Sequence, residues 1–245
     1  MNFLGKIPLQ TYPEEFVVSE LFKSSKQFQE FYKNERSKII NQIIWAHDET
    51  LPLGIDFRVT RHRSGKQYIR VIRIRIVPVS IDDAYKIAHE LTHLICDAEG
   101  FPSVGSTPKY ESIIGALNSM VHDLNVNEIL VRYGFDLIHE YESEIADDVR
   151  RLERFSTAPS DQLDRLLWIF NYVSTILDWE FINHSNKKSE FQVWFDQKFP
   201  EIAKEGKNLL VLVKRMGYDT PQKQFRLFQE INRQYKLNLP IAYLN

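Results

Sequence analysis

Residues 80–100 read SIDDAYKIAHELTHLICDAEG, and this stretch decides how the rest of the chain is interpreted. Apolar side chains recur in it at intervals of three and four residues, as they do on one face of an α-helix. They are Ala84, Ile87, Ala88, Leu91, Leu94, Ile95 and Ala98. Residues 80–83 offer several N-cap candidates, and Gly100 and Pro102 are typical stop signals. We therefore expect an amphipathic helix that runs to about Ala98 and packs its apolar face on the core.

Two histidines lie on the opposite side of this predicted helix. His89 and His93 are four residues apart, so their imidazoles share one face and lie about one turn apart. This spacing allows both side chains to reach a single metal ion. Glu90 lies about 100° round the helix, where its carboxylate would contact a water molecule and would not be a ligand. The pattern His-Glu-x-x-His thus predicts a zinc site with an adjacent general base.

The residues before this helix predict a pair of strands. Residues 57–61 and 72–76 alternate between apolar and polar side chains, which is the period of a half-buried strand. Ser64 and Gly65 between them favour a hairpin turn. We expect a hairpin followed directly by the helix that carries the histidines.

A hairpin followed by an HExxH helix resembles the zincin family of zinc metallopeptidases, over about residues 55–135. The five residues His89 to His93 are the specific part of the likeness, and the remainder matches in the order of elements. The resemblance implies a zinc-bound water that attacks a peptide carbonyl, with His89 and His93 as ligands and Glu90 as general base. It also implies that the edge strand binds extended substrate by strand addition. The expected substrate is therefore a peptide or protein, and the expected cofactor is Zn²⁺.

A catalytic zinc site takes three protein ligands, and the sequence leaves the third open. We favour Asp123, which borders the apolar stripe of a helix predicted at 110–133, and the run from Asp123 through Val126, Asn127 and Leu130 resembles the second metal helix of some bacterial metallopeptidases. The alternatives are His122, Glu111 at a gluzincin-like spacing, and Glu99 at the last position of the metzincin pattern, where Cys96 replaces the glycine. An oxyanion-stabilising residue is not singled out, although several Tyr and His side chains are available: Tyr85, Tyr110, His139, Tyr141 and His184.

The remainder of the chain predicts an α+β protein with a small zincin-like sheet and a mostly helical C-terminal half. Residues 14–47 are interpreted as one or two helices. Further helices are expected at about 138–155, 161–182, 188–216 with a break at Pro200, and 221–236. Residues 156–160 are the best linker, so we expect a metallopeptidase domain at 1–155 and a helical subdomain at 156–245.

Composition limits the classes of partner. The net charge is −2, which argues against a general nucleic-acid or membrane-surface protein. Cys96 is the only cysteine, and no signal-peptide pattern begins the chain, so we expect a cytoplasmic protein without disulfides. The oligomeric state is not indicated.

The predicted hairpin is strongly basic. It carries Arg58, Arg61, Arg63, Lys66, Arg70, Arg73 and Arg75. These residues predict either a solvated sheet face whose charges deter aggregation or a surface that binds an acidic substrate or a nucleic-acid backbone. The second possibility supports an alternative function, in which the chain is a zincin-like, non-catalytic binding or regulatory protein that uses the hairpin 57–76.

Overall fold

The structure is a computed structural model that describes residues 10–51, 55–64, 67–105, 108–181 and 187–243. The chain divides into two compact units. The first takes in the residues up to Gly100 together with Arg132–Phe135, and the second takes in Phe101–Val131 and Asp136–Tyr243. The domain boundary predicted at 155–156 falls inside the second unit.

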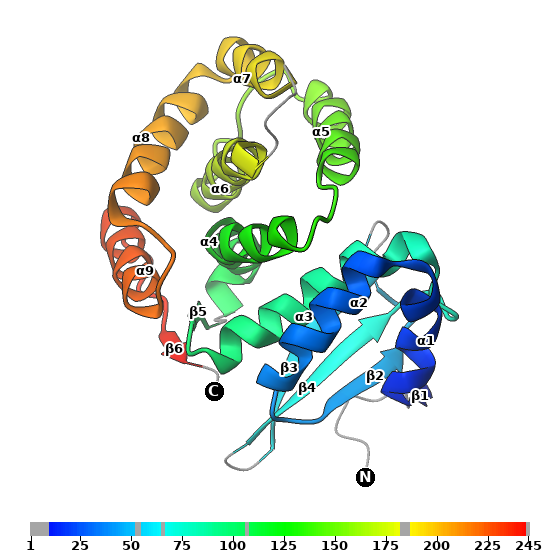
Figure 1. The fold of residues 1–245 in the computed structure, drawn as a ribbon. Helices are drawn as coiled ribbons and strands as arrows, with labels where there is room; N and C mark the ends of the chain where they lie inside the picture. The colour runs from blue at the N-terminus through cyan, green and yellow to red at the C-terminus, as the bar shows by residue number, and fades with distance from the viewer. Residues whose placement is uncertain (1–9, 52–54, 65–66, 106–107, 182–186, 244–245) are drawn as a thin grey trace. The chain divides into compact units, whose positions relative to one another are not determined.

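The first unit contains a mixed four-stranded sheet, drawn in blue and cyan in Figure 1. Its strands are β1 (Gln10–Tyr12), β2 (Ile43–His47), β3 (Phe57–Ser64) and β4 (Gln67–Ile74), in the spatial order β1-β2-β4-β3. β3 and β4 form an antiparallel hairpin as predicted, with Phe57 opposite Ile74. β4 spans Gln67–Ile74, so the strand predicted at 72–76 is displaced toward the C-terminus, and the predicted turn residue Gly65 lies outside the described residues. β2 runs parallel to β4. β3 is therefore an edge strand.

Three helices complete the first unit: α1 (Glu14–Ser24), α2 (Lys26–Glu35) and α3 (Ala84–Ala98). The hydroxyl of Ser25 caps α2 by accepting a hydrogen bond from the Phe28 amide. α2 packs against α3, and α3 packs against β3. Short 3-10 turns, η1 (Arg36–Lys38) and η2 (Ile81–Asp83), precede β2 and α3.

The helical interpretation of residues 14–47 is wrong at its C-terminal end. Isoleucines at 39, 40, 43 and 44 imitate a helical period, but Ile43 and Ile44 belong to β2 and pair with Arg70 and Val71. β-branched side chains pack well on a pleated surface and lose rotamer freedom in a helix, and pairing with β4 decides between the two.

The second unit is mostly helical. It contains α4 (Glu111–Arg132, of which the last residue is assigned to the first unit), α5 (Ile138–Glu153), α6 (Gln162–Asp178), α7 (Lys187–Lys198), α8 (Pro200–Met216) and α9 (Pro221–Tyr235). Figure 1 shows α6 enclosed by the other helices of this unit, and it buries side chains such as Leu166, Ile169, Phe170 and Val173. Two 3-10 turns, η3 (Pro108–Tyr110) and η4 (Trp179–Phe181), and a two-stranded sheet of β5 (Pro102–Val104) and β6 (Ile241–Tyr243) complete it.

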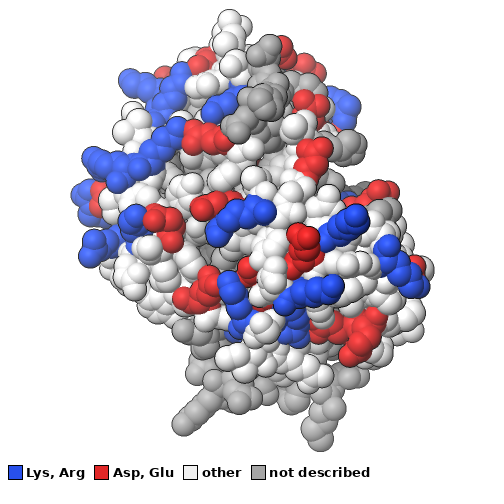
Figure 2. Space-filling model, viewed as in Figure 1, with Lys and Arg blue, Asp and Glu red and all other residues white. Residues whose placement is uncertain are grey.

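The predicted class, α+β with a small sheet and many helices, is confirmed at that level, and the helices after residue 80 lie close to their expected positions. Acidic and basic side chains are interspersed on the face drawn in Figure 2, in line with the small net charge. Within the part of the chain that the structure describes, no helix is both long and apolar enough to cross a membrane.

Candidate metal centre

The helix α3 forms as its periodicity predicts. Ile87, Ala88, Leu91, Leu94 and Ile95 are buried to within 1% of full burial, so the apolar stripe is the core face. The helix ends where Gly100 adopts φ +85°, a left-handed conformation that glycine reaches without a Cβ clash. His89, Glu90 and His93 remain half-buried on the other side. Because the apolar face of α3 is buried in the core, the side chains of His89, Glu90 and His93 lie together on the opposite side of the helix.

The two histidines converge on one point. Their Nε2 atoms lie 3.1 Å apart, and the ring centroids lie 4.7 Å apart. Two nitrogens that bind one zinc at 2.0–2.1 Å with tetrahedral geometry lie roughly 3.3 Å apart, so the observed spacing suits a shared metal ion. Burial lowers the pKa of His89 to about 4. The imidazole is therefore neutral near pH 7, and neutral imidazole is the form that ligates metals.

Glu90 is anchored to the neighbouring edge strand. Its Oε2 atom accepts a hydrogen bond of 2.7 Å from the backbone N–H of Val59 in β3. Burial raises the pKa of Glu90 to about 7, against the opposing effects of the Val59 N–H and of the positive charges of Arg61 and Arg58. A carboxyl group whose pKa lies near neutrality is suited to accept and return a proton.

Two further side-chain contacts join α3 to β3 and to the residue just before it. The Lys86 ammonium lies 2.7 Å from Asp56, just before β3. Arg61 of β3 pairs at 2.5 Å with the fully buried carboxylate of Asp97. The pKa of Asp97 is raised above its ordinary value, because burial outweighs the opposing positive charges of Arg61 and Arg70. Sequence reasoning missed Asp97, although its position four residues after His93 places it one turn further along the same helix face.

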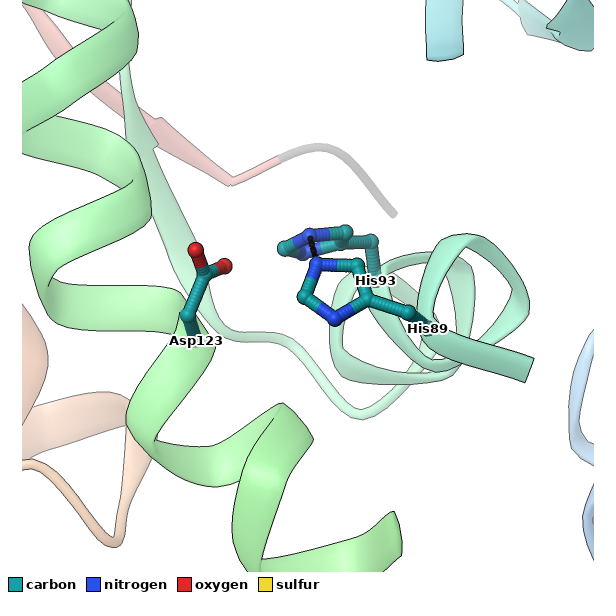
Figure 3. Close-up of side chains that lie close together, drawn as sticks. All are labelled: His89, His93 and Asp123. Carbon is teal, nitrogen blue, oxygen red and sulfur yellow. Dashed lines mark hydrogen bonds between the residues drawn. The ribbon is translucent and has the colours of Figure 1, made fainter. Parts of the chain in front are cut away.

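Asp123 on α4 joins the two histidines in a group that could hold a metal ion. Each residue offers one ligand atom, and the three atoms all lie within 4.8 Å of one another. Figure 3 draws the side chains of His89, His93 and Asp123, with the hydrogen bond between the two imidazoles as a dashed line. Two imidazole nitrogens and one carboxylate oxygen make a donor set that zinc accepts in catalytic sites.

Two of the alternative third ligands, His122 and Glu99, contact other residues. The buried His122 places its Nε2 atom 2.9 Å from the carbonyl oxygen of Pro102, and its ring packs on Phe228. Glu99 is exposed and pairs with Lys38 at 3.0 Å. The side chain of Glu111 lies outside the described residues. Among the described residues, therefore, neither His122 nor Glu99 joins the group around the histidine pair.

Three arginines of the hairpin region, Arg61, Arg73 and Arg75, have partners inside the first unit, whereas Arg58 is exposed. Arg73 pairs with the buried Asp48 at 3.0 Å, and Arg70 is only 2% exposed. The guanidinium of Arg75 donates to the carbonyl oxygens of Leu51 and Ile55. Together with the pair of Arg61 and Asp97, these contacts place part of the hairpin's positive charge inside the first unit.

Comparisons of the chain with protein-family models, with curated proteins and with solved structures found no match.

Proposed function

We propose that this chain is a zinc-dependent peptidase of the zincin type. His89 and His93 are the first two metal ligands in this proposal, Asp123 is the third, and Glu90 is the general base. The observation that carries it is the convergence of two imidazole Nε2 atoms, 3.1 Å apart, beside a carboxylate anchored to an edge strand. The histidines belong to the first compact unit and Asp123 to the second, so the third ligand is tested separately below.

A zinc ion held by these residues would supply Lewis-acid chemistry, since it would polarise a carbonyl and lower the pKa of water. The chain's own residues supply the rest. Because Oε2 of Glu90 is fixed by Val59, Oε1 is the atom that takes the proton from the attacking water. The same atom then returns that proton to the departing amine, as general acid–base catalysis requires.

The position of β3 at the edge of the sheet supports peptides or proteins as the substrate class. An extended segment can add to such an edge through main-chain hydrogen bonds. The alternative, a non-catalytic binding protein that uses the basic hairpin, is weakened by the internal partners of Arg61, Arg73 and Arg75.

The metal is tested by elemental analysis of protein purified without added zinc or chelator. We expect about one zinc per chain, the stoichiometry of a single three-ligand site. His93→Ala should lose most of it. The matched control is His47→Ala in β2, whose imidazole contacts the carbonyl oxygen of Arg75 and which should keep its zinc. Folded wild-type protein without metal would overturn the proposal, and zinc retained without cleavage of a broad peptide library would favour the binding alternative.

A further inference from the structure

The helix α3 is joined at three places to β3 and to the residue just before it. The joined pairs are Lys86 with Asp56 at 2.7 Å, Glu90 with the Val59 N–H at 2.7 Å, and Asp97 with Arg61 at 2.5 Å. On α3 the three side chains are spaced by four and seven residues, so they lie on one stripe of the helix. Their partners follow in the same order along the strand. One polar stripe of α3 therefore faces β3, and both elements belong to the first unit.

The two elements advance by the same amount between the outer pairs. A helix rises by about 16 Å from Lys86 to Asp97, and an extended chain rises by about 16 Å from Asp56 to Arg61. Both ion pairs can thus form at once without bending of either element, and the hydrogen bond of Glu90 lies between them. A slip of β3 by one residue, about 3.3 Å, would separate all three pairs.

The outer pairs differ in how well they resist such a slip. Lys86 and Asp56 each keep 35% of their side-chain surface exposed, and an ion pair in contact with water contributes little. The Asp97 carboxylate is fully buried, and the Arg61 side chain is 24% exposed. Charges interact more strongly in the low dielectric of the interior, and loss of one partner of a buried pair is strongly destabilising. The Arg61–Asp97 pair is therefore the stronger of the two.

β3 depends on these contacts because it is an edge strand. In the described sheet it pairs with β4 along one side, and the Val59 N–H points away from that ladder. Backbone groups on an outer edge have no second strand to fix them. The position of this N–H, and with it the orientation of the Glu90 carboxylate, is therefore set by the contacts that hold β3 against α3.

We propose that Arg61 and Asp97 are positioning residues for the proposed general base. Their pair, two residues beyond Val59 on β3, fixes the strand along α3 so that the Val59 N–H stays on Oε2 of Glu90. Neither side chain contacts the reacting atoms in this proposal. The catalytic consequence rests on the proposed peptidase function, whereas the effect on the hydrogen bond between Val59 and Glu90 does not.

The test measures this hydrogen bond directly, by NMR of the full chain isotope-labelled at valine. Val59→Ala identifies the Val59 amide signal by its disappearance. Asp97→Asn keeps the size of the side chain and removes its charge, so the Val59 amide proton should shift upfield and exchange with solvent ~10-fold faster or more. Lys86→Gln, at the more exposed end, should change the exchange rate less. The measurement requires neither zinc nor turnover, so its outcome is independent of the peptidase proposal.

Further variants separate positioning from general loosening of the unit. Arg61→Gln should act as Asp97→Asn does, and Arg61→Lys, which keeps the charge, should retain most of the protection from exchange. Asp48→Asn is the matched control, because it removes another buried carboxylate that pairs with an arginine of the same sheet, Arg73 on β4, and it should leave the Val59 amide as in the wild type. On a cleaved library peptide, Asp97→Asn should lower kcat by ~10-fold or more, with KM and zinc content unchanged.

Circular dichroism checks that each variant is folded, and Arg61→Gln replaces Asp97→Asn if the latter is not. A Val59 amide that is unchanged in the folded variants would overturn the proposal. So would an equal change in Asp48→Asn, since the effect would then be unspecific. Loss of zinc affinity in Asp97→Asn with an unchanged Val59 amide would overturn it as well, because Asp97 would then act through His93, one turn before it on α3.

Discussion

The backbone N–H of Val59 donates a hydrogen bond of 2.7 Å to Oε2 of Glu90, which joins the edge strand β3 to the HExxH helix at the candidate general base. The contact fixes one carboxylate oxygen and defines the direction of the other. In a peptidase it acts as a positioning contact, since a misplacement of about 1 Å can cost on the order of 10²-fold in rate.

Replacement of this donor should therefore slow turnover without removing the metal. Val59→Pro deletes the N–H, which faces away from the β3–β4 ladder, and edge strands tolerate proline at such positions. We expect kcat on a cleaved library peptide to fall by roughly 10-fold or more, with zinc content unchanged. Val59→Ala, which keeps the N–H, is the control.

Glu90→Gln should keep the zinc and lose nearly all turnover, because the amide cannot accept the proton. A fully active Glu90→Gln enzyme would contradict the mechanism.

Asp123 is expected to bind the metal directly. Asp123→Ala should weaken zinc binding by more than about 100-fold, the upper end of what loss of an outer-shell partner costs. Competition with a chromogenic chelator measures the change. Glu128→Ala, an exposed acidic position on the same helix, is the control and should bind zinc as the wild type does. If Asp123→Ala keeps its zinc while His93→Ala loses it, another residue is the third ligand and the peptidase proposal stands.

Asp48 predicts a specific dependence of stability on pH. Its carboxylate accepts hydrogen bonds from the Thr50 hydroxyl and amide and pairs with Arg73, and these contacts hold its pKa below the ordinary value. A carboxyl whose pKa is lowered by folding stabilises the protein above its unfolded pKa, and this contribution disappears as pH falls through the folded pKa. Asp48→Asn should thus reduce the free energy of unfolding by about 1–3 kcal/mol at pH 7.

The difference between Asp48→Asn and wild type should shrink when urea unfolding is repeated near pH 3, because the wild-type carboxyl becomes protonated. Glu49→Gln, one residue away with an 83% exposed side chain, is the matched control and should change stability little at either pH. A gap between Asp48→Asn and wild type that stays constant from pH 7 to pH 3 would contradict the role assigned to Asp48.

Two glycines in helices should respond oppositely to alanine. A Cβ on the buried Gly206 of α8 would lie 2.4 Å from Cδ1 of Tyr172 on α6, whereas a Cβ on Gly115 of α4 meets nothing within 4 Å. Alanine is favoured over glycine in helices by about 1 kcal/mol, but overpacking a core costs about 1–3 kcal/mol. Thermal unfolding should show Gly115→Ala to be stabilised and Gly206→Ala destabilised. Stabilisation of both would mean that the α6–α8 interface relaxes at little cost.

The sequence alone determined the features that depend on local periodicity. The presence of the β3–β4 hairpin follows from alternation, although β4 spans Gln67–Ile74 and not the predicted 72–76, and α3 follows from its apolar stripe and its stop at Gly100. The i, i+4 spacing of His89 and His93 places both imidazoles on one face of any helix that contains them. These predictions succeed because each depends on residues within a few turns of one another.

The tertiary structure decided the features that depend on long-range pairing. Ile43 and Ile44 lie in β2 because β4 pairs with them, a partner more than twenty residues away that the local period does not reveal. The Asp97 carboxylate pairs with the Arg61 guanidinium, and the Val59 N–H donates a hydrogen bond to the Glu90 carboxylate. Each contact joins two residues that lie more than thirty positions apart in the sequence. The environments of the candidate third ligands likewise come from other elements, such as Pro102 for His122 and Lys38 for Glu99. A side chain's position on its own helix follows from the sequence nearby, but its partner follows from how distant segments bury their apolar faces together.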